Sequence, residues 1–148
     1  MQYQVEKLNI RVLKEAEYPT QIMLREEILR KPLGLSFSDK DLKAEQGQIY
    51  IGGFLGDELV AGCMLVDLPD YTMRIRQVAV ASAHQGKGLG EKLMIWCEKY
   101  AKEKNHKKII LNAREDVKAF YLKLGYLENG EPMMELGLVH RWMKKDLI

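Results

Sequence analysis

Apolar and polar positions in the first half of the chain form several short runs that are typical of β-strands. The β-branched Val5, Ile10 and Val12 favour a first strand over residues 3–12. Two later runs, Ile49–Leu55 and 59–66, are joined by Gly56-Asp57-Glu58, a good hairpin turn. A further strand is predicted over residues 71–80, after the Pro69-Asp70 turn. These last three strands follow one another directly, which predicts an antiparallel meander.

Two helices are predicted between the first strand and the meander. Thr20 is a candidate N-cap, and the apolar residues that follow recur at near-helical spacing until Pro32 and Gly34 stop the run. This predicts a helix of about three turns. Ser38-Asp39 opens a second, shorter helical pattern that Gly47 ends.

The second half of the chain changes to a helical period. Leu89, Leu93, Trp96, Cys97 and Tyr100 recur on one face, with charged residues on the other, which is the clearest helix in the sequence. A short strand over residues 108–112 and an amphipathic helix over residues 117–124, closed by a glycine, come next. Two last strands are expected over residues 133–136 and 139–147.

Strand, helix, strand and helix in succession imply one parallel strand pair. The fold class is therefore α/β, a mixed and largely antiparallel sheet with helices packed on its faces. No repeat or linker interrupts the chain of 148 residues, so a single domain over residues 1–148 is expected.

Composition excludes several classes of function. The formal net charge of +2 is too small to indicate a nucleic-acid binder. No apolar run reaches the roughly 20 residues of a membrane span, and the amino terminus lacks the features of a signal peptide, so we expect no membrane association and a cytoplasmic protein. Cys63 and Cys97 belong to no metal-binding motif, and we interpret both as buried apolar residues.

The candidate chemistry begins with a glycine-rich loop between the 71–80 strand and the long helix. Its residues are Gln85, Gly86, Lys87, Gly88, Leu89 and Gly90. Three glycines let the backbone turn tightly and leave its N–H groups uncovered. Those groups also begin a helix, so they are unpaired donors at the positive end of the helix dipole. The loop is therefore a candidate phosphate site, with a plain strand-to-helix turn as the alternative.

Spacing argues against two other phosphate-binding motifs. A P-loop requires Ser or Thr directly after its lysine, whereas Lys87 is followed by Gly88. The dinucleotide fingerprint GxGxxG belongs to a first βαβ unit, whereas this loop reads GxGxG and lies past the middle of the chain.

The chain resembles the GNAT superfamily of N-acetyltransferases over nearly its whole length. The loop at residues 85–90 fits the Q/R-x-x-G-x-G/A pyrophosphate motif of that family, and the preceding RQVAV is similar to its acyl-CoA-facing strand. A second signature is the sequence IILNAR followed by AFYLKLGY. The segments REEILRKPLGL and ELGLVH look similar to a poorly characterised bacterial branch.

The resemblance implies a fold in which the sheet splays at its parallel strand pair and acetyl-CoA enters the opening. The pyrophosphate would bind the loop at residues 85–90, and the Val80 N–H would serve as an oxyanion donor. No metal is implied, and homodimers are common in the family. The other residues implied to contact acetyl-CoA are Val78, Ala79, Asn112, Phe120, Tyr121 and Lys123.

Acetyl transfer by direct amine attack requires a base for the amine and an acid for the departing thiolate. Tyr121 occupies the tyrosine position of the family and is the candidate acid, with a core aromatic as the alternative. Glu135 and His140 are the candidate bases, because the tail would flank the acceptor site and an imidazole titrates in the required range. A surface or hydrogen-bonded core histidine is the alternative for His140.

Four further residues have structural interpretations that are at least as good as functional ones. We expect His84 to be a turn residue and His106 to belong to a solvated basic turn. Arg25 and Glu26 are placed on the first helix, either lining the acceptor site or on a solvated face.

The resemblance thus favours an enzyme, an acetyl-CoA-dependent N-acetyltransferase (EC 2.3.1.-) that uses a primary amine as acceptor through a ternary complex. Two alternatives on the same fold are a non-catalytic acyl-CoA sensor and a protein-interaction module. The acceptor, a small molecule or a protein, is left open by the sequence.

Overall fold

The structure is a computed structural model that describes residues 7–148. The strands are β1 (Asn9–Val12), β2 (Ile49–Leu55), β3 (Glu58–Leu68), β4 (Thr72–Val80), β5 (Lys108–Arg114), β6 (Leu127–Glu128), β7 (Met133–Glu135) and β8 (Leu138–Asp146). The α-helices are α1 (Tyr18–Leu29), α2 (Asp39–Ala44), α3 (Leu89–Glu103) and α4 (Lys118–Lys123). Single 3₁₀ turns are formed by Glu15–Glu17, Lys31–Leu33, Ser82–His84 and Glu115–Val117.

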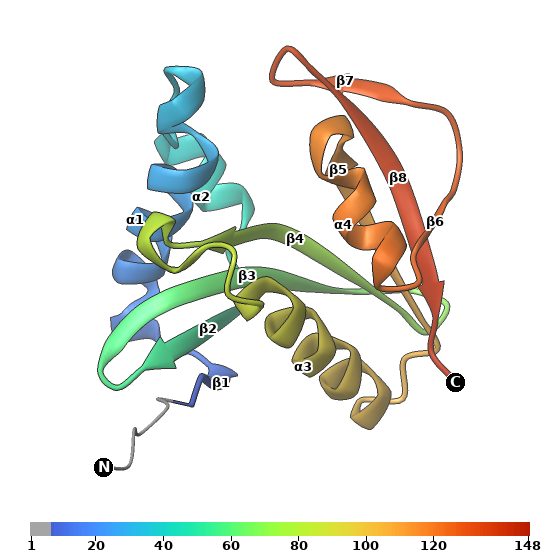
Figure 1. The fold of residues 1–148 in the computed structure, drawn as a ribbon, viewed down its shortest axis with the longest axis horizontal. Helices are drawn as coiled ribbons and strands as arrows, with labels where there is room; N and C mark the ends of the chain where they lie inside the picture. The colour runs from blue at the N-terminus through green and yellow to red at the C-terminus, as the bar shows by residue number, and fades with distance from the viewer. Residues whose placement is uncertain (1–6) are drawn as a thin grey trace. The chain divides into compact units, whose positions relative to one another are not determined.

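Hydrogen bonds link the described strands in the order β1-β2-β3-β4-β5-β8-β6, with β7 paired to β8 (Figure 1). Strands β4 and β5 are parallel, and the pairs β1–β2, β2–β3, β5–β8, β6–β8 and β7–β8 are antiparallel. The predicted mixed sheet with one parallel pair is therefore confirmed. None of the helices in residues 7–148 has the length and apolar character needed to cross a membrane.

The described chain divides into two compact units. The first holds the chain up to Leu65 together with Gln77–Trp96, and the second holds Val66–Arg76 together with Cys97–Ile148. Strands β3 and β4 and helix α3 continue from one unit into the other.

The helices of the first unit begin at different kinds of cap. Helix α1 begins at Tyr18, because a 3₁₀ turn leads into it and Pro19 suits the first helical turn. Thr20 lies inside the helix, so its prediction as N-cap is wrong. Helix α2 begins as predicted: the Ser38 Oγ accepts from the Asp41 N–H at 3.1 Å, and Asp41 accepts from the Ser38 N–H at 2.9 Å.

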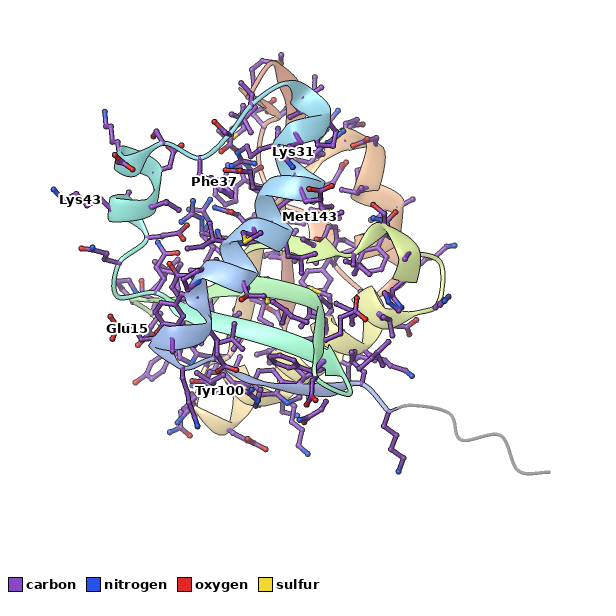
Figure 2. All side chains as sticks on the ribbon, turned by 90° about the vertical axis from the view of Figure 1, so that its left-hand side faces the viewer. Glu15, Lys31, Phe37, Lys43, Tyr100 and Met143 are labelled. Carbon is purple, nitrogen blue, oxygen red and sulfur yellow. The ribbon has the colours of Figure 1, made fainter. Side chains whose placement is uncertain are left out.

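The core of the first unit is built on the predicted hairpin of β2 and β3. Leu13, Tyr50 and Met64 form a buried cluster against which Tyr18 packs, with its ring stacked on Tyr50 at 3.9 Å between centroids. Gly62 has no side chain because an added Cβ would lie 3.0 Å from the Ile51 carbonyl oxygen. Figure 2 shows the side chains of this unit, with Phe37 between α1 and α2 and Lys43 pointing outward. The first predicted strand is confirmed for Asn9–Val12, and residues 3–6 lie outside the described part.

In the second unit, helix α4 lies beside strands β5 and β8 (Figure 1), and the end of α3 is linked to β8 through Glu98 and Lys145. The core of this unit includes Cys97, Ile109, Leu111, Tyr126 and Met143, each at most 3% exposed. Helix α3, strand β5, helix α4 and the two tail strands are confirmed. The two-residue strand β6 was not predicted, since a run this short carries no period.

Glu98 corrects one detail of the predicted helix pattern. It is one of the charged residues that the sequence pattern puts on the face of α3 opposite its apolar residues, yet its carboxylate accepts from the Tyr126 hydroxyl at 3.0 Å and from the Lys145 ammonium at 2.8 Å. The same ammonium donates to the Leu124 carbonyl oxygen at 2.7 Å, so Glu98 and Lys145 fasten α3, α4 and β8 together.

Candidate functional site

The glycine loop of the first unit has an open backbone. Gly86 and Gly88 adopt φ angles of 76° and 79°, a left-handed conformation that strains any residue with a Cβ. A Cβ built on either glycine would have no atom within 4 Å, so the space in front of this backbone is clear. Both glycines are therefore required by conformation, and neither is required by close packing.

Helix α3 starts directly from this loop. The first helical bond in this segment joins the Lys92 N–H to the Gly88 carbonyl oxygen at 3.2 Å. The N–H groups of Leu89, Gly90 and Glu91 precede that bond and have no intrahelical acceptor. Together with the helix dipole they favour an anion at this position.

Side chains around the loop hold it to the end of β4. The Gln85 Nε2 donates to the Val80 carbonyl oxygen at 2.9 Å, so Gln85 fixes the loop. Lys87 is exposed and can add a positive charge. His84 ends a 3₁₀ turn, which confirms its interpretation as a turn residue. Val78 and Val80 are half-buried, and Ala79 is buried in the core at 2% exposure.

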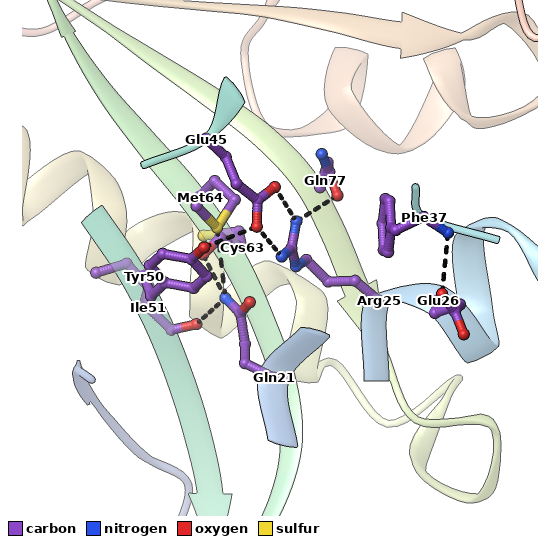
Figure 3. Close-up of polar contacts among 10 residues, drawn as sticks. All are labelled: Gln21, Arg25, Glu26, Phe37, Glu45, Tyr50, Ile51, Cys63, Met64 and Gln77. Carbon is purple, nitrogen blue, oxygen red and sulfur yellow. Dashed lines mark hydrogen bonds and ion pairs between the residues drawn. The ribbon is translucent and has the colours of Figure 1, made fainter. Parts of the chain in front are cut away.

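Gln77, the residue before Val78, interrupts β4 with a φ of 55°. A left-handed conformation is uncommon in a non-glycine residue and has to be held by its surroundings. The Gln77 Oε1 accepts from the Arg25 guanidinium at 2.5 Å (Figure 3). Helix α1 thereby holds the side chain of a residue that interrupts β4 within the predicted acyl-CoA-facing segment RQVAV.

Arg25 is at the centre of a buried polar network in the first unit. It is 0% exposed and donates to both carboxylate oxygens of Glu45, at 3.0 and 2.6 Å. Glu45 also accepts from the Tyr50 hydroxyl at 2.7 Å, and burial is the main reason that the pKa of Tyr50 is raised. Arg25 was predicted either on a solvated face or at the acceptor site. The structure instead buries it in an internal ion pair with Glu45.

Glu26 and His106 both make hydrogen bonds that the sequence did not indicate. Glu26 accepts from the Phe37 N–H at 2.9 Å and fastens the segment that follows α1. His106, in the second unit, bonds to Asp67 at 2.7 Å, and only 8% of its side chain is exposed. The prediction of a solvated turn is therefore wrong for the His106 ring.

In the second unit, Asn112, Glu135 and His140 come together. Strands β5 and β7 both pair with β8, which brings Asn112 and Glu135 to the same face of the sheet as His140. The Asn112 Nδ2 donates to the Glu135 carboxylate at 3.1 Å, and the His140 Nε2 lies 4.0 Å from the same carboxylate. Both candidate bases therefore share one cluster, and Asn112 positions one of them.

The His140 ring has a defined tautomer when it is neutral. Its Nδ1 lies 3.0 Å from the Leu138 carbonyl oxygen, which can only accept, so Nδ1 carries the proton. The lone pair is then on Nε2, on the side of Glu135. Only 8% of the His140 side chain is exposed, so the surface interpretation of His140 is ruled out. What is left is a hydrogen-bonded histidine with a free lone pair on Nε2.

Arg74 lies on the same sheet face and was not singled out in the sequence. It pairs with Ile110 on β5, two residues before Asn112, and its guanidinium lies 5.0 Å from the centroid of the Trp142 ring. Burial lowers the pKa of Arg74, the nearby Arg76 charge lowers it further, and the Glu135 charge partly opposes both effects. The alternation of Arg74 and Arg76 with the apolar residues of β4 was the available signal.

Tyr121 lies in an aromatic cluster on α4. It is 7% exposed, and its ring makes edge contacts with Phe120 and Tyr126 at 5.0 and 5.8 Å between centroids. The ring of Tyr121 is therefore part of the core, as the alternative interpretation of this residue predicts. The proposed role as an acid concerns its hydroxyl group alone. Lys123 is exposed at the end of the same helix.

Comparison with known proteins identifies the family. The model of the acetyltransferase (GNAT) family matches residues 11–126. Among solved structures, a protein from Lactobacillus plantarum assigned as an N-acetyltransferase has a TM-score of 0.85 at 23% identity, over 95% of this chain and 99% of that chain.

Two other solved structures have the same fold at lower identity. The ribosomal-protein-S18-alanine N-acetyltransferase from Escherichia coli has a TM-score of 0.80 at 16% identity, over 95% of this chain and 94% of that chain. An aminoglycoside 6'-N-acetyltransferase complexed with coenzyme A has a TM-score of 0.76 at 18% identity, over 95% and 97% of the two chains. The family model covers most of the chain, and the chain therefore belongs to the GNAT family of acetyltransferases.

Proposed function

We propose that this protein transfers an acetyl group from acetyl-CoA to a primary amine by direct attack within a ternary complex. The observation that carries the proposal is the open left-handed backbone at Gly86 and Gly88, directly before the unpaired N–H groups of α3. Those groups suit a pyrophosphate. The family match and a structural neighbour complexed with coenzyme A support the same ligand.

The remaining acetyl-CoA contacts follow the family pattern. Backbone groups of Val78, Ala79 and Val80 would bind the pantetheine arm, and the Val80 N–H would stabilise the oxyanion. In the second unit, Asn112 and the α4 residues Phe120, Tyr121 and Lys123 would contribute the other contacts with the arm and the thioester.

Each chemical step has a candidate residue in the second unit. The amine arrives protonated, and His140 takes a proton through Nε2, with the Glu135 carboxylate 4.0 Å away to stabilise the imidazolium. Glu135 itself is the second candidate for this step. The amine then attacks the thioester carbonyl, and Tyr121 gives a proton to the departing CoA thiolate. The second proton, which the attacking nitrogen loses as the amide forms, restores the Tyr121 phenol.

The cofactor assignment is tested with a pair of glycine variants. Gly88→Val should weaken acetyl-CoA binding by more than about tenfold, a loss of about 1.4 kcal/mol, because a branched side chain blocks the phosphate. Gly34→Val is the matched control, since Gly34 has a φ of 70° and no atom within 4 Å of an added Cβ. Calorimetry on both folded variants decides: equal affinities would remove the pyrophosphate assignment.

The base assignment is tested through pH dependence. His140→Ala should flatten the acidic limb of the kcat/KM profile and leave acetyl-CoA affinity nearly intact. An unchanged profile would make His140 structural and Glu135→Gln the next variant. Turnover itself separates the enzyme from the alternatives, because an acyl-CoA sensor would bind acetyl-CoA and release no CoA with any amine.

A further inference from the structure

A row of polar side chains crosses one face of the sheet in the second unit. Arg74 pairs with Ile110, and Asn112 pairs with Trp142. Alternate residues of a strand share a face, so Arg74, Asn112, Trp142 and His140 lie on the same face. We call these four residues, together with Glu135, the polar face.

The polar face has a negative end and a positive end. Glu135 is at the negative end, held by Asn112 at 3.1 Å and near His140 at 4.0 Å. Arg74 is at the positive end, on the neighbouring strand β4 and offset by two residues from Asn112. Strand spacing and rise place the backbones of Arg74 and Asn112 about 8 Å apart.

No carboxylate among residues 7–148 forms an ion pair with Arg74, and Glu135 attracts its charge only from a longer distance. The Arg74 Nε is buried without a hydrogen bond, and the guanidinium lies over the Trp142 ring. Four other arginines each contact a carboxylate: Arg11 with Glu17, Arg25 with Glu45, Arg114 with Asp116, and Arg141 with Glu115. A half-buried guanidinium costs free energy unless it is paired, so the chain itself leaves Arg74 without its stabilising anion.

We infer that Arg74 binds a carboxylate of the acceptor, and that the acceptor is an amino-carboxylic acid whose amine is directed to Glu135 and His140. A guanidinium on an aromatic ring presents its N–H groups as a planar fork that matches a carboxylate. Glu135 attracts the ammonium at the other end, and a short zwitterion suits the about 8 Å between the backbones of Arg74 and Asn112, the residue that holds Glu135. The inference rests on the proposed acetyl transfer and adds its substrate class.

The experiment measures CoA release with matched acceptors. Each standard amino acid is compared with its carboxamide and with the amine that lacks the carboxyl group. The wild-type protein should show kcat/KM at least about tenfold higher for one or more amino acids than for the matching carboxamide, the usual scale of a lost charged hydrogen bond. Arg74→Gln should bring that ratio close to one, mainly through KM for the acceptor.

Two variants complete the design. Arg74→Lys keeps the charge and should retain part of the preference, which protects the test if the glutamine variant folds poorly. Arg141→Gln removes an arginine on the opposite face of the sheet, already paired with Glu115, and should leave the ratio unchanged. A preference that survives in both Arg74 variants would overturn the inference.

The outcomes also separate this inference from the proposed function. Turnover of amines and carboxamides without any preference for carboxylates would overturn the inference and leave acetyl transfer standing. No turnover with any acceptor, in a protein that binds acetyl-CoA, would overturn both.

Discussion

Two arginines of the protein, Arg25 on α1 and Arg74 on β4, have opposite surroundings. Arg25 in the first unit is fully buried and bonded to both oxygens of Glu45 and to Gln77. Arg74 in the second unit is half-buried, contacts an aromatic ring and forms no ion pair with a carboxylate of the described residues, with Glu135 acting on it only from a distance. Both charges cost free energy to bury, and only one of these costs is offset inside the protein.

The surroundings of a buried arginine distinguish a structural charge from a functional one. A buried ion pair with every partner supplied by the chain fixes the elements that carry it, here α1, the end of α2 and the bend in β4. A cation that forms no ion pair within the chain is a place where a ligand can supply the missing anion. The first region should therefore respond to mutation through stability, and the second through chemistry.

The largest expected effect tests whether chemistry belongs to the second unit. Tyr121→Phe keeps the ring and its packing and removes the proposed acid, so kcat should fall by about 10²- to 10⁴-fold at unchanged acetyl-CoA affinity. Single-turnover rates measure this without interference from product release. Tyr126→Phe is the control, because its hydroxyl donates to Glu98 and should affect stability alone. A single-turnover rate within about twofold of wild type, far from the acid-catalysis range, would make Tyr121 only a packing residue.

The second prediction removes the ion pair between Arg25 and Glu45. Glu45→Gln keeps the shape of the side chain and leaves Arg25 as an uncompensated buried charge, so the free energy of unfolding should fall by about 3–5 kcal/mol. Urea denaturation measures the change. Gln77, which bends β4, should also lose its fixed position, since Arg25 holds it. A loss as small as that of an exposed pair, about 0–1 kcal/mol, would contradict the structural role.

The third prediction concerns Arg74, an arginine that forms no ion pair with the described residues. Arg74→Gln deletes a desolvated charge with no carboxylate to lose, so the free energy of unfolding should stay within about 0.5 kcal/mol of wild type or rise. The same denaturation experiment on Arg25→Gln should show a clear loss. Equal losses at the two sites would remove the distinction between them.

The smallest effect is expected at the ion pair between Arg11 and Glu17, which is much less buried than that of Arg25. The Arg11 guanidinium donates to Glu17 and lowers the pKa of that carboxyl from 4.5 to about 2. A lowered pKa stabilises the fold above the unfolded value, and this stabilisation is lost as pH falls from about 4.5 towards 2. Glu17→Gln should therefore slightly flatten the decline of stability over this range in acid titrations of unfolding. A curve identical to wild type would show that the solvent-exposed pair contributes nothing.

Local patterns predicted the elements well where a single segment contains the whole signal. The amphipathic period of α3, the capping residues of α2 and the turn between β2 and β3 are of this kind. The glycine loop was also predictable, because the glycines at positions 86 and 88 directly supply the positive φ angles and the uncovered backbone that the loop has.

Long-range partnerships were not predictable in the same way. Arg25 follows the pattern of a solvated helix residue, and only the fold brings it to Glu45, which lies 20 positions away after another helix. His106 and Glu98 were misjudged for the same reason, since Asp67 and Tyr126 come from distant strands and loops. The proximity of Glu135 and His140 is easier to predict from sequence, because both residues belong to one hairpin.

The burial of both thiols has a practical consequence for the assays above. Cys63 and Cys97 are the two cysteines of the chain, and each is 0% exposed. An aromatic disulfide reagent that detects released CoA therefore has no accessible protein thiol to consume it while the protein is folded. In the same cuvette, a slow additional signal of two thiols per chain would report unfolding, so one reagent can follow both turnover and the integrity of each variant.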